Sequence, residues 1–101
     1  MQIELKKIGE EGLLVKADGK IDLDSAVEFG TTIKDAIEDN DIKDVVLDFE
    51  KVTYISSIGL RVILELHQQM AKIGTMKLTN VQESILVIFK MTGFDKFLYI
   101  E

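Results

Sequence analysis

The sequence predicts one α/β domain, covering residues 1–101, with mostly parallel strands. Short apolar runs alternate along the chain with longer segments in which apolar residues recur at helical spacing. Their order is β-β-α-β-α-β-α with a final β, and this alternation is typical of parallel strands joined by crossover helices. With 47% hydrophobic residues, a chain of 101 residues also has enough apolar surface to bury one core without metals or disulfides.

The strands are predicted from short apolar runs between turn residues. The first run shows partial alternation of apolar and polar residues, and the Gly-Glu-Glu-Gly segment at 9–12 separates it from the second. The run Val45–Phe49 contains β-branched residues without polar alternation, which indicates a central strand covered on both faces. The predicted strands are 3–8, 13–15, 45–49, 76–79 and, at an edge of the sheet, 97–100.

A first helix is predicted after Gly19. Asp22 or Asp24 is expected to cap its start, and Asn40 is expected to end it. Its apolar residues at helical spacing are Leu23, Ala26, Val27, Gly30, Ile33 and Ile37.

The longest helical pattern covers Ser57–Ile73 and ends at Gly74. The stripe predicted to face solvent comprises Arg61, Glu65, Gln68 and Lys72. The opposite stripe, predicted to pack on the sheet, comprises Gly59, Ile63, Leu66 and Met70. A third helix is predicted to open with a capping box of Asn80 and Glu83 and to stop at Gly93.

Charge and composition argue against several classes of function. The formal net charge of −6 and the scattered basic residues disfavour nucleic-acid binding, because phosphate contacts need a basic face. No stretch approaches the roughly 20 apolar residues that cross a membrane, and the charged N-terminal segment lacks the apolar run of a signal peptide. The absence of cysteine fits a reducing compartment. We therefore expect a cytoplasmic protein that acts through other proteins.

The segment Val52–Leu64 is the main candidate for a functional site. It places Ser57 at the start of a helix, where unpaired backbone N–H groups and the positive end of the helix dipole stabilise a phosphate. Taken alone, a serine before a helix is most simply explained as a cap. Ile58 and Val62 lie to the side of the core-facing stripe and form an apolar shoulder next to Ser57. This shoulder either packs under a loop or belongs to a docking patch.

A hydrolase that uses Ser57, His67 and an acid such as Asp48 is the main enzymatic alternative. Ser57 and His67 are separated by ten positions of one predicted helix. This separation is about 15 Å along the axis and lies beyond hydrogen-bond reach. One histidine and no cysteine leave little for a transition-metal site, and neither common Gly-rich phosphate loop is present. We therefore expect no catalytic activity, cofactor or metal, and a histidine packed near the core.

The stretch Val45–Leu64 resembles the signature of STAS domains of the anti-sigma factor antagonist family. The resemblance extends through Gly19–Asp22 and through Met91–Asp95, so that it covers essentially the whole chain. It implies a single STAS-like domain with a four- or five-stranded mixed sheet and helices mainly on one side. It also implies a serine at the start of the second helix. A cognate anti-sigma factor, which is a serine kinase of the histidine-kinase-like ATPase fold, phosphorylates this serine in the family.

The resemblance further implies a cycle of partner binding. The unphosphorylated antagonist binds the anti-sigma factor and frees the sigma factor, the phosphorylated form lets go, and a serine phosphatase resets it. The acceptor in the family lies two residues before a Gly-Leu pair, and Ser57 holds that position here, while Ser56 stands where relatives often have Asp. The alternative is a non-phosphorylated STAS scaffold or sensor module in a larger regulatory assembly. The predicted partner-binding residues are Asp22, Ser56, Ser57, Ile58, Gly59, Arg61 and Val62.

Overall fold

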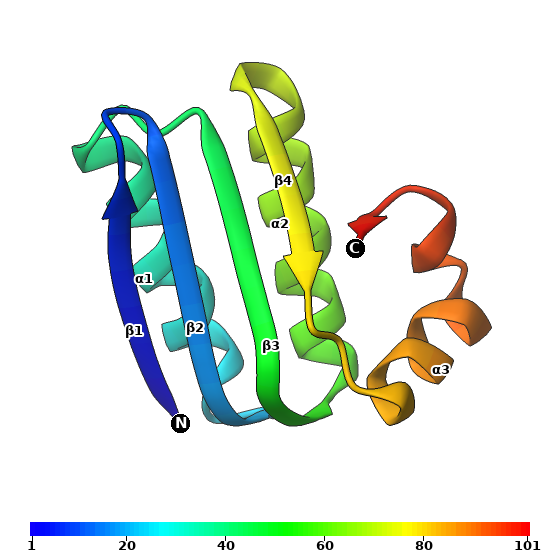
Figure 1. Cartoon of the computed structure of the whole chain (residues 1–101). Coiled ribbons are helices and arrows are strands. Elements are labelled where there is room, and N and C mark those ends of the chain that lie inside the picture. Colours follow the sequence, from blue (N-terminus) through cyan, green and yellow to red (C-terminus); the bar gives the residue numbers. More distant parts are fainter.

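The computed structural model describes all 101 residues and contains one five-stranded mixed sheet (Figure 1). The strands lie in the spatial order β1-β2-β3-β4-β5; β1 is antiparallel to β2, and the other neighbours pair in parallel. The predictions of a mixed sheet, of a central third strand and of a last edge strand are therefore confirmed. The strands are β1 (Gln2–Ile8), β2 (Gly12–Ile21), β3 (Asp44–Ile55), β4 (Thr75–Thr79) and β5 (Tyr99–Ile100).

Two long helices cover one face of the sheet. They are α1 (Ala26–Asp39) and α2 (Ser57–Ile73), and Figure 1 shows both behind the strands. Both crossovers step across the sheet in the same direction, from β2 to β3 and from β3 to β4. Since such crossovers are right-handed, both helices fall on the same face. A shorter helix, α3 (Glu83–Thr92), and a 3₁₀ turn at Phe94–Lys96 lead the chain back to β5. No helix is both long and apolar enough to cross a membrane.

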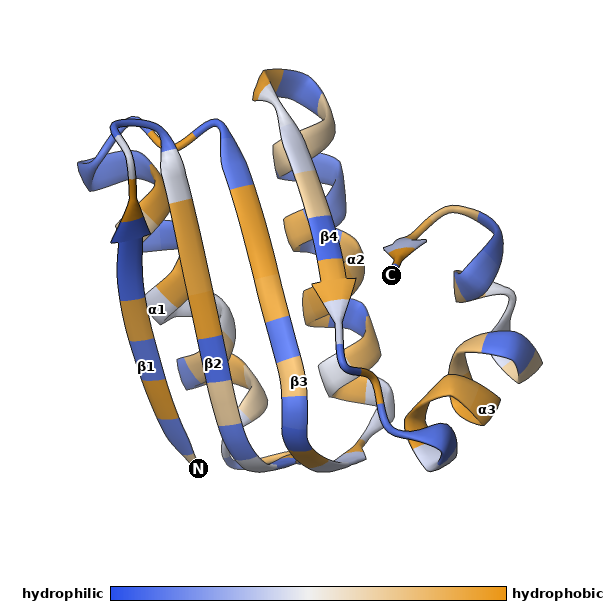
Figure 2. Cartoon of the chain, in the orientation of Figure 1, coloured by the Kyte–Doolittle hydropathy of each residue, from blue (hydrophilic) through white to orange (hydrophobic).

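The core lies between the sheet and the two helices. Every second residue of β2 from Leu13 to Ala17, and of β3 from Val45 to Phe49, is buried against them, and Figure 2 shows hydrophobic stretches along both strands. The other face of β3 carries half-buried Val46 and Asp48 and exposed Glu50. The prediction that this strand is covered on both faces is therefore wrong, because no helix lies on that side.

β3 continues to Ile55, well beyond the predicted end at Phe49. Its register against β2 shifts twice, first where Lys16 pairs with Asp48 but Asp18 pairs with Lys51, and again where Gly19 pairs with Val52 but Lys20 pairs with Tyr54; β3 uses one extra residue each time. The extra residues break the alternation of buried and exposed side chains that identifies a strand. As a result, Ser56 alone separates the end of β3 from the start of α2.

The helix predictions are mostly confirmed. Gly74 ends α2, Asn40 ends α1, and both predicted stripes of α2 are exposed or buried as expected. Among the apolar residues at helical spacing in this region, Leu23, just before α1, and Val27, on α1, are 67% and 64% exposed. The others are all buried: Ala26, Gly30, Ile33 and Ile37.

The predicted capping box at the start of α3 is also wrong. Asn80 has a left-handed backbone with φ 56° and does not bond the helix start. Its side-chain amide donates instead to Asp48 Oδ1 at 3.1 Å, which ties the end of β4 to β3. The predicted end of α3 at Gly93 is confirmed by a left-handed C-cap with φ 80°.

Candidate functional site

The ends of β2 and β3 meet at one edge of the sheet, the lower edge in Figure 1. Ile21 pairs with Ile55, and the backbone N–H of Ser56 donates to the carbonyl of Ile21 at 2.9 Å. Asp22 follows Ile21 directly, and Ser57 follows Ser56. The parallel register therefore brings the loop that begins at Asp22 next to the start of α2, as the site prediction requires.

Ser56 and Ser57 have different environments. Ser56 Oγ accepts a hydrogen bond from the backbone N–H of Gly59 at 3.1 Å, and the Ser56 carbonyl accepts from Leu60 at 2.9 Å, so Ser56 is the N-cap of α2. Ser57 is the first residue of the helix, is exposed, and its hydroxyl makes no hydrogen bond within the chain. The capping explanation therefore applies to Ser56 and leaves the Ser57 hydroxyl available.

The backbone around Ser57 is suited to hold an anion. The N–H groups of Ser57 and Ile58 have no partner within the chain. They lie at the positive end of a 17-residue helix, where a negative group is stabilised by typically 0.3–1 kcal/mol. A phosphate attached to Ser57 Oγ would lie beside these groups.

Asp22 is held in place by Ser25. Its Oδ1 accepts hydrogen bonds from the backbone N–H groups of Asp24 and Ser25, both at 3.1 Å, and from Ser25 Oγ at 3.1 Å. The hydrogen bonds from the backbone and hydroxyl of Ser25, followed by those from the loop backbone, lower the pKa of Asp22 below its ordinary value of 3.8. Asp22 is therefore charged at neutral pH, and it holds the turn that leads into α1, whereas the N-cap of α1 is Ser25 and not the predicted Asp22 or Asp24. Ser25 was not predicted as part of this site, although its position three residues after Asp22 matches a capping box.

Two predicted partner-binding residues are buried. A Cβ at Gly59 would lie 2.7 Å from Ile55 Cγ1 and 2.8 Å from Ile21 Cγ2, so glycine is what allows α2 to start this close to the sheet. Val62 is only 7% exposed and belongs to the core. Neither residue therefore offers an accessible side chain in the isolated domain.

Of the two residues predicted to form the apolar shoulder, only Ile58 is accessible. Ile58 is half-buried and packs on the edge of the core, whereas Val62 is covered by α1. Arg61 is exposed, and neither of the two ion pairs of the chain includes it. Ser57, Ile58 and Arg61 are thus the predicted residues of α2 that remain accessible.

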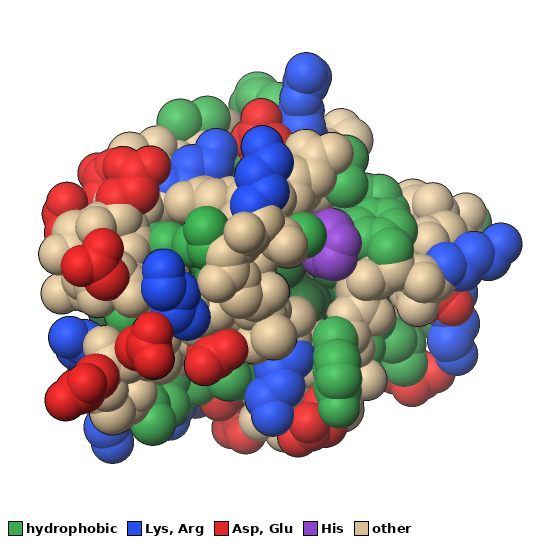
Figure 3. Space-filling model, turned by 90° about the horizontal axis from the view of Figure 1, so that it is seen from above, with side chains coloured by type: hydrophobic (Ala, Val, Ile, Leu, Met, Phe, Trp, Pro, Cys, Tyr) green, Lys and Arg blue, Asp and Glu red, His purple; other side chains and the backbone are tan.

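The groups of the hydrolase alternative lie apart. Ser57 and His67 are in the same helix, as predicted, and Asp48 accepts hydrogen bonds from Glu50 N and Asn80 Nδ2 on the sheet. His67 is half-buried, and its ring lies against Phe97 with 5.0 Å between centroids. Figure 3 shows this one histidine beside hydrophobic side chains. These residues form no catalytic constellation.

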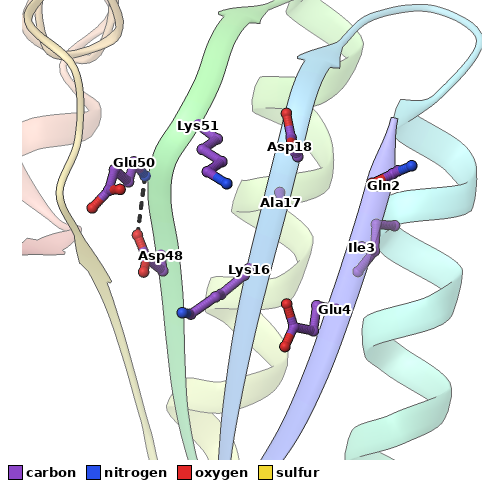
Figure 4. Close-up of a pocket in the computed structure, with 9 residues that line it drawn as sticks. All are labelled: Gln2, Ile3, Glu4, Lys16, Ala17, Asp18, Asp48, Glu50 and Lys51. Atoms are coloured by element: carbon purple, nitrogen blue, oxygen red, sulfur yellow. Dashed lines mark hydrogen bonds between the residues drawn. The ribbon is translucent and has the colours of Figure 1, made fainter.

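A hollow of about 600 Å³ lies on the sheet face that has no helix (Figure 4). Its charged residues alternate in sign from strand to strand, as when Glu4 pairs with Lys16 and Lys16 pairs with Asp48. This hollow contains none of the predicted site residues. Its charged residues are Glu4, Lys16, Asp18, Asp48, Glu50 and Lys51.

Comparisons with known proteins agree on the family. Unphosphorylated SpoIIAA, an anti-sigma factor antagonist, is 18% identical with a TM-score of 0.84, over 99% of this chain and 88% of that chain. The phosphorylated form of Bacillus SpoIIAA has a TM-score of 0.76 at 18% identity, over 99% and 91%. An anti-sigma factor antagonist from Mycobacterium paratuberculosis has a TM-score of 0.87 at 18% identity, over 98% and 83%. These likenesses show a shared fold. Since the STAS domain family model matches residues 2–101, the chain belongs to the STAS domain family.

Proposed function

We propose that this domain is an anti-sigma factor antagonist that is switched by phosphorylation of Ser57. The unphosphorylated domain binds an anti-sigma factor, a serine kinase of the histidine-kinase-like ATPase fold, and thereby frees a sigma factor. A serine phosphatase restores the binding form. The observation that carries the proposal is the difference between the two serines: Ser56 caps α2, whereas Ser57 exposes an unbonded hydroxyl. The fold shared with SpoIIAA in both its unphosphorylated and phosphorylated forms supports the same role.

Phosphorylation would weaken the complex more than the domain. A phosphate adds about −1.5 to −2 charges, which the free N–H groups of Ser57 and Ile58 offset in the isolated domain. In the complex the same charge has to lose water near half-buried Ile58 and close to the carboxylate of Asp22. A loss of ~3 kcal/mol would lower the affinity more than a hundredfold.

The domain itself is proposed to have no catalytic activity and to work in the cytoplasm. Its part in the cycle is to present Ser57 to the kinase and to release the partner afterwards. An activity that hydrolyses an ester or a nucleotide would contradict this part of the proposal, if that activity copurifies with the protein and disappears in Ser57→Ala.

The test combines phosphorylation with binding. The purified domain is incubated with candidate anti-sigma kinases and ATP, the mass of the intact protein is measured, and the phosphate is mapped. We expect one phosphate on Ser57, binding of Ser57→Ala that no longer depends on ATP, and weak binding of Ser57→Asp. Ser56→Ala is the matched control and should still be phosphorylated.

Two outcomes would contradict the switch. One is a phosphate mapped to Ser56, and the other is a Ser57→Ala protein that ATP still releases from the kinase. A domain that no anti-sigma kinase modifies or binds, but that assembles stably with other regulatory proteins, would support the alternative of a STAS scaffold or sensor module.

A further inference from the structure

The side of α1 that packs against α2 extends beyond the point where α2 begins. Two contacts define the stripe of α1 that faces α2. A Cβ at Gly30 would lie 2.8 Å from Val62 Cγ1, and Lys34 Nζ lies 3.3 Å from Glu65 Oε1. Both helices run in the same direction, since each connects two parallel strands of the same sheet (Figure 1).

Leu23 and Val27 belong to this same stripe. Positions 23, 27, 30 and 34 are spaced by four, three and four residues, which keeps them on one side of a helix. The backbone N–H of Ala26 donates to the carbonyl of Asp22 at 2.9 Å, so the helical turn already includes Leu23.

The exposure of these two residues follows from the length of α2. Stepping back one turn from the pair Gly30 and Val62 places Val27 opposite Ile58, at the beginning of α2. Leu23, one turn further, has no residue of α2 to face. Leu23 and Val27 are therefore 67% and 64% exposed, next to half-buried Ile58. Leu23, Val27 and Ile58 are called the seam patch below.

Acidic groups surround the seam patch. Asp24, in the turn before α1, and Glu28, in the first turn of α1, are exposed and adjoin Leu23 and Val27 in sequence, and Asp22 lies just before them. Together with Met1, Lys20 and Ser25, these three acids line a shallow hollow of about 410 Å³. The charged lining is three carboxylates, the ammonium group of Lys20 and the α-amino group of Met1; this excess of negative charge favours a basic partner.

We propose that the seam patch is the apolar anchor of the docking surface, with Leu23 and Val27 inserting into an apolar pocket of the anti-sigma factor that is bordered by Lys or Arg. This inference rests on the proposed function, because the occupant is the partner that docks at Ser57. Continuity with the start of α2 and charge complementarity to Asp24 and Glu28 select this occupant. Leu23 and Val27 lie outside α2, so phosphorylation of Ser57 acts at the Ile58 edge of the anchor and leaves these two side chains unchanged.

The experiment measures binding of the unphosphorylated domain to its anti-sigma factor by calorimetry. Leu23→Ala and Val27→Ala should each weaken binding about tenfold, as expected for anchoring side chains. Val87→Ala and Met91→Ala are the matched controls. They change another exposed apolar pair at the same spacing, 44% and 82% exposed on α3, and should leave the affinity unchanged. The melting temperature of each variant reports folding separately.

A charge reversal provides a second measurement. Glu28→Lys should slow association severalfold at low salt, and the difference should shrink as salt is added. Glu38→Lys changes the net charge equally at the other end of α1 and should have a smaller effect.

The outcomes separate this inference from the switch. If the unchanged domain binds and is released by Ser57 phosphorylation while the seam-patch variants bind as tightly as the controls, the anchor is refuted and the proposed function stands. If the unchanged domain does not bind any anti-sigma factor, both are refuted. Equal slowing by Glu28→Lys and Glu38→Lys would refute the local charge complementarity.

Discussion

Asp22 and Ser25 bond each other reciprocally in the turn that precedes α1. The backbone N–H of Ser25 donates to Asp22 Oδ1 at 3.1 Å, and the backbone N–H of Asp22 donates to Ser25 Oγ at 2.9 Å. The one hydroxyl hydrogen of Ser25 is shared between Asp22 Oδ1 and the carbonyl of Lys20, which lies 2.6 Å from Ser25 Oγ and joins the turn to the end of β2. This network fixes the turn that places Leu23 beside the start of α2.

The first prediction concerns Asp22 and pH. Because hydrogen bonds from Ser25 lower the pKa of Asp22 in the folded state below 3.8, the charged cap stabilises the fold above that value. This stabilisation is lost as the pH falls through the lower folded pKa. We expect Asp22→Asn to reduce the free energy of unfolding at pH 7 and the difference from the unchanged protein to shrink in the acid range, measured by urea titration at several pH values.

Asp24→Asn is the control for this prediction. The carboxylate of Asp24 accepts no hydrogen bond within the chain, although Asp24 lies in the same turn as Asp22. Its substitution should leave the pH dependence unchanged. An Asp22→Asn difference that stays constant from neutral to acid pH would show that the charge of Asp22 does not contribute.

The second prediction separates the two serines by stability. Ser56→Ala removes the cap of α2 and should cost about 1 kcal/mol in the free energy of unfolding. Ser57→Ala removes an exposed hydroxyl without an intrachain hydrogen bond and should change the free energy of unfolding by less than about 0.5 kcal/mol. Urea denaturation of both variants tests this. Equal losses would mean that the two hydroxyls share the cap.

The third prediction concerns the close approach of α2 to the sheet. Gly59→Ala places a methyl group 2.7 Å from Ile55 Cγ1 and 3.0 Å from the carbonyl oxygen of Ile21. Overpacking of this kind costs about 1–3 kcal/mol, which exceeds the gain of up to about 1 kcal/mol from replacing glycine in a helix. We expect a net loss in the free energy of unfolding. Gln68→Ala, on the exposed side of the same helix, should change it by less than about 0.5 kcal/mol.

The periodicity of the sequence predicts the order of elements along the chain and the core-facing stripe of α2, because regular alternation and helical spacing are local properties. The same alternation does not predict the part of β3 after Phe49. There Glu50 and Lys51 are both exposed at a register shift, and the next buried residue is Val52. Asn80 likewise has the spacing of a capping residue, but its side-chain amide donates a hydrogen bond to Asp48 on a neighbouring strand. In both cases a contact between strands overrides the local pattern.

In the candidate site, too, some residues can be predicted from local sequence and others depend on contacts between distant segments. Ser57 and Asp22 are found from the sequence because helix starts carry recognisable residues. Leu23 and Val27 have the spacing of core residues and are exposed only because α2 begins one turn too late to cover them. Val62 shows the reverse, since it lies to the side of the core-facing stripe and is buried where Gly30 on α1 comes close to it. These outcomes depend on how two distant helices align, which no local pattern contains.

The last prediction concerns the phosphate on Ser57 and follows from the proposed switch. Arg61 lies one helical turn after Ser57, is exposed and takes part in neither ion pair of the chain. Residues four apart on a helix are neighbours, so the guanidinium can reach a phosphate on Ser57. Arg61 and the free N–H groups of Ser57 and Ile58 favour the doubly charged phosphate. They should therefore lower its second pKa below the value of about 6 for a free phosphoserine.

We expect Arg61→Gln to raise this second pKa by about 0.4 unit, which corresponds to ~0.5 kcal/mol for an exposed pair at this spacing. The measurement is the pH dependence of the phosphorus NMR shift of the phosphorylated domain. Lys72→Gln removes a positive charge from the far end of the same helix and should leave the titration unchanged. Because the dianion is favoured in the folded state, the phosphate stabilises the fold above about pH 6, and this contribution is lost as the pH falls through the lowered pKa. Identical titration curves for the unchanged and Arg61→Gln domains would show that Arg61 does not contact the phosphate and remains available to the partner.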